Sequence, residues 1–268
     1  MKILMAGDTH GDLHHLRYLF TIAKQHECDR IFVLGDFGWW AHMQWGVEFL
    51  EQLNLSANLK NIHVYWLDGN HDKISHLYEH YGSPEHLDPE GFVRTHPYLH
   101  YAPRGHRWTW DEVRFISLGG AYSVDKRERL IRERNSGPGS EWFPEEQMTD
   151  RDMDVILENR EPVDVMLAHD MPRGANPGWS RNNFLECEEN QNRLRVAVQT
   201  LSPVLYLHGH LHWPYEDEMW FGHIGPTREM RSIKIVGLDC NGNGAQWPGY
   251  TQEASWMVLD TVDVVKRS

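Results

Sequence analysis

Side chains that could bind divalent cations stand at five places along the 268-residue chain, each close behind an apolar run. Asp8 and His10 are two positions apart, so on an extended segment they point to the same side and could hold one cation. The carboxylate of Asp36 has two oxygens and could bridge two cations. In chain order, the five segments are Asp8-Thr9-His10, Gly35-Asp36, Gly69-Asn70-His71-Asp72, His169 and Gly209-His210-Leu211-His212.

The donors in these segments are carboxylate and carboxamide oxygens and imidazole nitrogens, with no thiolate among them. This mixture suits Mn, Fe, Zn, Co or Ni better than Ca. Two such cations, about 3.5–4 Å apart, would activate a water molecule and bind phosphoryl oxygens opposite it. The residue types therefore predict a centre of two divalent metal ions suited to hydrolysing phosphate esters. They leave the identity of the metals open.

The apolar runs before these segments have the composition of buried β-strands. Most are continuous rather than alternating, which is typical of strands covered on both faces. Helical periodicity lies between them, and Leu13, Leu16 and Ala23 share one face of a helix that ends near His26. The pattern predicts an α/β fold with a more β-rich C-terminal half. Strands are expected at Lys2–Ala6, Arg30–Leu34, Ile62–Leu67, Arg114–Leu118, Val163–Ala168, Pro203–Leu207, Ser232–Leu238 and near Ser255–Leu259, with further helices at 149–159, where Thr149 begins a capping box, and 188–200.

Each of the five polar segments follows the carboxyl end of an expected strand. Ligands bind at this edge of open α/β sheets, so side chains between Asp8 and His212 could converge there. The sequence has no repeat, low-complexity tract or long Pro/Gly linker, and 1–268 is expected to form a single domain. Within it, 119–147 is a long connection that could lie over the site as a lid.

The composition of the chain limits which binding partners and which cellular compartment we expect. The formal net charge of −13 disfavours binding to duplex nucleic acid, which relies on Lys and Arg to neutralise phosphates. The three cysteines are far apart, which favours a reducing compartment over a disulfide framework. The N-terminus has no signal-peptide core, and no apolar stretch approaches the roughly 20 residues that cross a bilayer. A cytoplasmic protein without a membrane partner is expected, and its oligomeric state is left open.

The ordered set D-x-H, G-D, G-N-H-D, H and G-H-x-H resembles the motifs of the calcineurin-like metallophosphoesterase superfamily, from Asp8 to His212. The resemblance implies a two-layer β-sandwich of mixed sheets flanked by helices. It also implies that His71 contacts the phosphate and protonates the leaving oxygen, while Asp72 orients the His71 imidazole. The metal ligands that it implies are Asp8, His10, Asp36 and His212 for one ion, and Asp36, Asn70, His169 and His210 for the other.

The chain departs from the superfamily's protein-phosphatase and dinucleotide-tetraphosphatase branches in one respect. Those branches place an arginine shortly after the second motif to clamp a phosphate dianion, whereas Asp36 is followed here by Phe37-Gly38-Trp39-Trp40. A dianionic monoester gains most from such bidentate partners, and a diester carries one charge fewer. The chain is therefore expected to lie nearer the phosphodiesterase branches. The expected substrate is a small phosphodiester, nucleotide-like or a cyclic nucleotide.

Three alternatives stay open. A phosphomonoesterase, including a protein phosphatase, of the same superfamily is the nearest. A nuclease is disfavoured by the acidic balance. A non-catalytic interaction module would be expected to lack several ligands or His71, and all of them are present.

Several other residues have a structural interpretation, and some of them also have a functional one. The basic cluster Lys126–Arg134 is expected to be a solvated helix face, with a phosphate-guiding lid as the alternative. One of its arginines could replace the missing clamp. Turns, packing or a place behind the ligands are expected for Asp12, Asp68 and His208. Trp39 and Trp40 could stack on a base or pack in the core.

Overall fold

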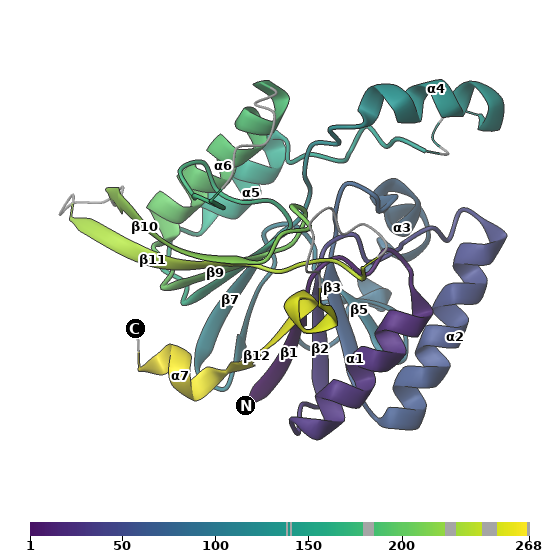
Figure 1. Ribbon diagram of the computed structural model, residues 1–268, viewed down its shortest axis with the longest axis horizontal. Helices are drawn as coiled ribbons and strands as arrows, with labels where there is room; N and C mark the ends of the chain where they lie inside the picture. The colour runs from purple at the N-terminus through teal and green to yellow at the C-terminus, as the bar shows by residue number, and fades with distance from the viewer. Residues whose placement is uncertain (138, 140, 179–184, 223–228, 243–250, 267–268) are drawn as a thin grey trace.

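Two six-stranded mixed sheets form the centre of the structure, a computed structural model that describes residues 1–137, 139, 141–178, 185–222, 229–242 and 251–266 (Figure 1). In each sheet four parallel strands lie between antiparallel edge strands. The first sheet has the order β12 (Trp256–Asp260), β1 (Lys2–Ala6), β2 (Arg30–Leu34), β3 (His63–Leu67), β5 (Leu99–Tyr101), β4 (Val93–His96). The second has the order β10 (Tyr215–Gly222), β11 (Met230–Gly237), β9 (Leu205–His208), β8 (Val165–Ala168), β7 (Val113–Leu118), β6 (Arg107–Trp110).

Alternate side chains of the central strands enter two different cores. On β1, Ile3 and Met5 join a cluster that contains residues of both sheets, whereas Leu4 and Ala6 pack with residues of the flanking helices. Strands covered on both faces need continuous apolar runs, which is the observed pattern. The α/β sandwich of two mixed sheets flanked by helices is thereby confirmed.

Helices cover the outer faces of both sheets (Figure 1). Figure 1 shows α1 and α2 beside the first sheet, α5 and α6 beside the second, and α4 above them, apart from the sheets. The capping box at Thr149 is present, since its side chain accepts from the Asp152 N–H and the Asp152 carboxylate accepts from the Thr149 N–H. The helices are α1 (Leu13–Gln25), α2 (Gln44–Lys60), α3 (Ile74–Tyr81), α4 (Lys126–Ser136), α5 (Asp150–Glu158), α6 (Leu185–Leu201) and α7 (Thr261–Val265), with 3₁₀ turns at Pro84–His86 and Gln252–Ser255.

The sequence did not predict four strands and three helices, namely β4, β5, β6, β10, α2, α3 and α7. Strands β4, β5 and β6 are only three or four residues long. Strand β10 is an edge strand with Glu216 and Glu218 on its exposed face, so it lacks a continuous apolar run. The expected 119–147 connection contains α4, and residues 138 and 140 lie outside the described residues. Within the described part of the chain, no helix is both long and apolar enough to cross a membrane.

Buried His15 on α1 leads to a prediction about acid stability. Burial lowers the pKa of His15 from 6.5 to about 4. As the pH falls below 6.5, the His15 imidazole is therefore protonated in the unfolded chain before it is protonated in the folded protein. The free energy of unfolding declines between about pH 6.5 and pH 4, by about 3 kcal/mol in total. His15→Gln cannot titrate, so its unfolding free energy should decline less steeply over this window. Urea unfolding at several pH values, with metals chelated, measures the slope, and an unchanged slope in the variant would contradict the assignment.

Candidate metal centre

The expected polar side chains converge where the carboxyl ends of β1, β2 and β3 meet those of β8 and β9. Asp8 follows β1 and Asp36 follows β2, while His169 directly follows β8. The two sheets thus contribute to one site, and residues distant in sequence come together. Three groups have potential ligand atoms within 4.8 Å of one another: Asp8, His10 and His212; His10, Asp36 and His71; and Asp8, Asp36 and His169.

Asp8 lies at the centre of one half of the site. Its Oδ2 atom is 2.9 Å from Nε2 of His212, and that nitrogen is 3.1 Å from Nε2 of His10. The other carboxylate oxygen, Oδ1, accepts a hydrogen bond of 2.9 Å from the backbone N–H of His210. Two imidazoles and one carboxylate oxygen therefore face a common point, as ligands of a single cation would.

Asp36 lies between this half and the other. Its Oδ1 atom is 3.5 Å from Nε2 of His169, and its Oδ2 atom is 3.8 Å from Nδ1 of His10. Oδ1 of Asn70 lies 3.1 Å from the same His169 nitrogen. The His210 ring packs against the His169 ring, with centroids 5.0 Å apart. Asp36 is thus placed between the Asp8 group and the His169 group, where a bridging carboxylate would have to lie.

Hydrogen bonds behind the site fix how two of these side chains face it. Nδ1 of His169 lies 2.8 Å from the carbonyl oxygen of Leu34, a contact that places the proton on Nδ1 and turns Nε2 inward. The Asn70 amide donates through Nδ2 to Oγ of buried Ser123, at 3.0 Å, which leaves its oxygen toward the site. Ser123 was missed by the sequence analysis, because one serine after a strand has no distinguishing spacing.

The two buried carboxylates need positive charge beside them. Burial raises the pKa of Asp8, but His169 and His212 lower it to about 2. Burial likewise raises the pKa of Asp36, while His71 and His169 hold it well below its ordinary value. In the opposite sense, burial lowers the pKa of His169, but Asp36 and Asp8 raise it to about 10. The imidazoles therefore supply counter-charge to the carboxylates, and divalent cations bound by the same atoms fit this electrostatic demand.

The backbone around the site is strained. Asp36, His10, His210 and His212 all have positive φ, between 46° and 63°, which is uncommon for residues other than glycine. Such outliers cluster at functional sites, where surrounding structure holds them. Four of the expected site residues thus occupy a costly conformation that turns their side chains inward.

Gly35 allows the His169 ring to approach β2, which leads to a second prediction. A Cβ at this position would lie 2.1 Å from Nδ1 of His169, and φ here is +92°. Gly35→Ala should displace the imidazole and lower the bound metal. The matched control is Gly178→Ala, where φ is +80° and no described atom lies within 4 Å of the added Cβ. The control should cost only about 1–2 kcal/mol of backbone strain and retain its metal. Equal metal content in both variants would contradict the role of Gly35.

The expected contact between Asp72 and the His71 imidazole is wrong. Both oxygens of buried Asp72 accept backbone N–H groups instead, at 2.7–3.0 Å, from Phe37, Gly38, Trp39 and Gly69. The turn after Asp36 directs three of these N–H groups at the carboxylate, which occupies its lone pairs. Asp72 therefore fixes the segments that carry Asp36 and Asn70.

His71 lies at the rim of the site, next to a basic residue of α4. Its backbone N–H donates to Oδ1 of Asp36 at 2.8 Å, and its ring nitrogen Nε2 is 3.8 Å from Oδ2 of Asp36. The guanidinium of Arg129 contacts the same ring through Nη2. The pKa of His71 is lowered to about 4, mainly by burial. Arg129 also lowers this pKa, whereas Asp36 opposes the shift.

The solvated-face expectation for the basic cluster is wrong for Arg129, whose residue exposure is 2%, and correct for its exposed neighbours Arg127, Arg132 and Arg134. Asp12 caps α1 by accepting from the His14 and His15 N–H groups. Asp68 is buried and accepts from Tyr101 and Arg104. His208 packs within the fold against Tyr215. Trp39 is fully buried in the core, whereas Trp40 is partly exposed.

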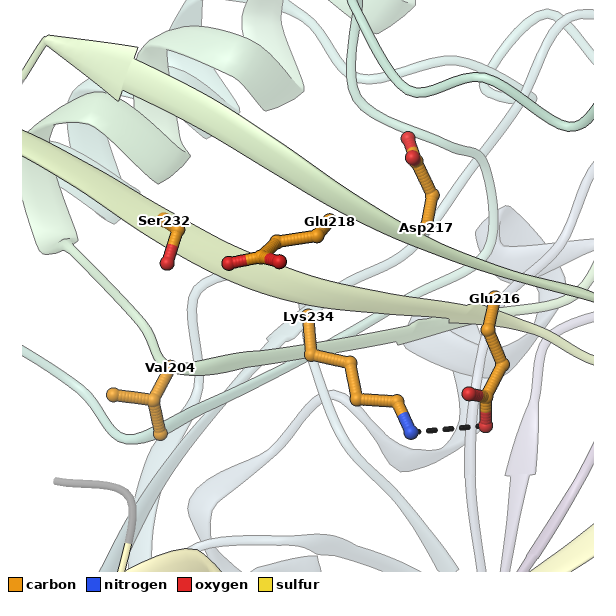
Figure 2. A pocket seen from close by; sticks show the side chains of 6 residues that line it. All are labelled: Val204, Glu216, Asp217, Glu218, Ser232 and Lys234. Carbon is orange, nitrogen blue, oxygen red and sulfur yellow. Dashed lines mark hydrogen bonds and ion pairs between the residues drawn. The ribbon is translucent and has the colours of Figure 1, made fainter.

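A cavity of about 580 Å³ lies away from this centre, over β10 and β11. Figure 2 shows Glu216, Asp217 and Glu218 along it, with Lys234 paired to Glu216 at 2.9 Å. The Asp217 carboxylate points to the opposite side of β10, so Glu216 and Glu218 face the single cation Lys234 (Figure 2), and this net negative charge repels phosphate anions. The cavity shares no residue with the three groups of potential metal ligands.

Comparisons with known proteins give a family match and similar folds. A family model described as calcineurin-like phosphoesterase matches residues 1–214. A dimetal phosphatase from Danio rerio has a similar structure, with a TM-score of 0.54 and 11% identity over 96% of this chain and 91% of that chain. The protein TT1561 of Thermus thermophilus has a TM-score of 0.50 and 16% identity over 91% of each chain. At these identities the structural likeness shows the fold alone. None of the curated proteins matches the sequence significantly.

Proposed function

Because the chain belongs to the calcineurin-like phosphoesterase family, we propose that it hydrolyses small nucleotide-like phosphodiesters, including cyclic nucleotides, at a centre of two divalent metal ions. Family membership and the buried His/Asp groups make it a metal-dependent phosphoesterase. The diester preference is the finer part of the proposal. The diester preference depends on the side chains that surround the metal centre.

The proposed metal ligands are chosen from the side-chain contacts of the candidate metal centre. Oxygens and imidazoles around Asp8 would hold one cation, and those around His169 and Asn70 the other, with Asp36 shared between them. When bound, the cations supply an activated water nucleophile and stabilise negative charge on the phosphoryl oxygens. The proposed sets are Asp8, His10, Asp36 and His212 for one ion, and Asp36, Asn70, His169 and His210 for the other.

His71 is proposed as the proton donor to the leaving oxygen. Its ring lies at the rim, within 3.8 Å of Asp36, so a substrate held by the metal centre would reach it. The pKa of the imidazole is low without substrate. A phosphoryl anion beside the ring would raise that pKa by Coulomb attraction, which favours the protonated acid. General acid catalysis of this kind contributes about 10²–10⁴-fold.

The diester preference is supported by one observation: the segment after Asp36 offers aromatic rings to the site instead of a cation. Trp40 is partly exposed and lies over Gly11, where an added Cβ would be 2.7 Å from its ring. The ring of Trp45, which is 51% exposed, is 4.8 Å from that of Trp40, centroid to centroid. Such rings stack on nucleobases, and this stacking is worth about 1–3 kcal/mol per base.

A phosphomonoester is the second candidate, and the position of Arg129 favours it. The guanidinium that the sequence lacks after Asp36 is brought to His71 from α4 instead. A cation there would serve a dianionic phosphate.

A substrate panel tests the proposal. The manganese-loaded, iron-loaded and zinc-loaded proteins are each assayed on 2′,3′- and 3′,5′-cyclic nucleotides, dinucleotides, bis(p-nitrophenyl) phosphate and p-nitrophenyl phosphate. The proposal predicts a higher kcat/KM on bis(p-nitrophenyl) phosphate than on p-nitrophenyl phosphate, and a further gain on the diesters that carry a base. A higher kcat/KM on p-nitrophenyl phosphate would replace it with the second candidate.

A further inference from the structure

Arg129 is a buried cation that, among the described residues, has a carboxylate partner only on the Nε side of its guanidinium. Its Nε donates to Oδ1 of Asp125 at 2.9 Å, and Nη1 lies 3.4 Å from the carbonyl oxygens of Asn70 and Glu141. The remaining nitrogen, Nη2, meets only the His71 ring among the described contacts. A guanidinium is normally buried with its donor fork on carboxylate or phosphate oxygens. Here the Asp125 carboxylate, 44% exposed, covers only the Nε side.

The helix that carries Arg129 is attached to the body almost entirely by polar contacts. Arg129 is the only residue of α4 that is buried, while Leu130 and Ile131 are exposed. Figure 1 shows α4 above the rest of the fold and separate from both sheets. Further attachments join α4 to Glu141 and Trp142: an ion pair between Arg132 and Glu141, two backbone N–H groups that donate to the Glu133 carboxylate, and the ammonium of Lys126 over the Trp142 ring. Packing in the hydrophobic core therefore does not hold helix α4 in position. The one buried side chain of α4 is that of Arg129.

The inner end of this guanidinium points toward the rim where a phosphate ester would bind. His71 is the next residue after Asn70, and its ring lies between Arg129 and Asp36. A phosphoryl group held by the Asp36 and Asn70 side of the centre would present its outer oxygens toward this rim. Arginine binds such oxygens through two parallel N–H···O hydrogen bonds. These hydrogen bonds are shorter and stronger than the hydrogen bond of a guanidinium to a neutral imidazole.

We propose that Arg129 is a substrate-binding residue that leaves the His71 ring to bind the non-bridging phosphoryl oxygens. It thereby replaces, from a helix remote in sequence, the arginine that other branches place after the second motif. The inference rests on the proposed function only in placing a phosphate ester at the metal centre. Since a monoester has one more negative charge than a diester, Arg129 should contribute more to monoester turnover and set the ratio between the two.

The test compares Arg129→Gln with Arg127→Gln, an identical charge change at an exposed position two residues away on the same helix. For the full-length, manganese-loaded proteins, the inhibition constant of inorganic phosphate, kcat/KM on p-nitrophenyl phosphate and on bis(p-nitrophenyl) phosphate, bound manganese and Tm are measured. Arg129→Gln should weaken phosphate binding about 10- to 100-fold, the range for losing a hydrogen bond to a charged group. It should lower monoester kcat/KM about 100-fold and diester kcat/KM less, with bound manganese unchanged.

Arg127→Gln should match the wild type in every readout. Equal phosphate inhibition in the two variants would overturn the proposal, as would an equal loss on both esters that follows a lowered Tm. Higher wild-type activity on the monoester would overturn the diester preference while leaving Arg129 to be judged by phosphate affinity. If the wild type cleaves neither ester, calorimetric binding of inorganic phosphate decides, and no difference between Arg129→Gln and the wild type contradicts the assignment.

Discussion

Asp36→Asn is expected to lower kcat by about 1,000-fold or more and to reduce the bound metal to one ion or none. Asparagine keeps the size of the side chain and tolerates the positive φ of this position, so the change removes mainly the charge and one ligand oxygen. Metal ions contribute several kcal/mol to phosphoryl transfer, and about 1.4 kcal/mol corresponds to a factor of ten. Turnover of a chromogenic ester and elemental analysis measure the two effects.

The matched control is Asp29→Asn, which makes the same chemical change at an exposed carboxylate just before β2. It should keep both turnover and metal content. If Asp36→Asn retained two ions and near-wild-type turnover, the bridging role of Asp36 would be wrong.

His71→Ala is expected to lower kcat by about 100- to 10,000-fold, the contribution of general acid–base catalysis, without changing the bound metal. The loss should depend on the leaving group, because a good leaving group such as p-nitrophenolate needs little proton donation. An ester with an alkyl or ribose leaving group should therefore show a much larger loss than a nitrophenyl ester. Steady-state kinetics on both kinds of ester measure the difference.

The control for this variant is His14→Ala, which removes an exposed imidazole at the start of α1. Its kinetics should be those of the wild type. A His71→Ala loss that is the same for good and poor leaving groups would argue against proton donation and leave His71 a phosphate-positioning role.

The central strands and the place of the site could be predicted because both depend on local sequence patterns. Continuous apolar runs such as Ile31–Leu34 require burial on both faces, and the strand assignment was confirmed for every central parallel strand except the three-residue β5. The polar segments after these strands had to meet at one edge, and the structure brings Asp8, Asp36 and His169 together. Their roles as metal ligands stay predictions.

The features that were missed depend on contacts between distant segments. Arg129 lies in the same run of charged residues as the exposed Arg127 and Arg132, and nothing in its sequence neighbours separates it from them, so only the path of the 119–147 connection turns it inward. The family resemblance implied that Asp72 orients the His71 imidazole. The turn after Asp36 instead directs its N–H groups at that carboxylate, a backbone geometry that residue spacing does not encode.

Anomalous diffraction from crystals grown with manganese tests the central claim most directly. Two peaks about 3.5–4 Å apart are predicted, one on each side of the Asp36 carboxylate, with Asp8 and His212 beside one and Asn70 and His169 beside the other. A single peak, or peaks located only elsewhere, such as among the carboxylates of β10, would contradict the account.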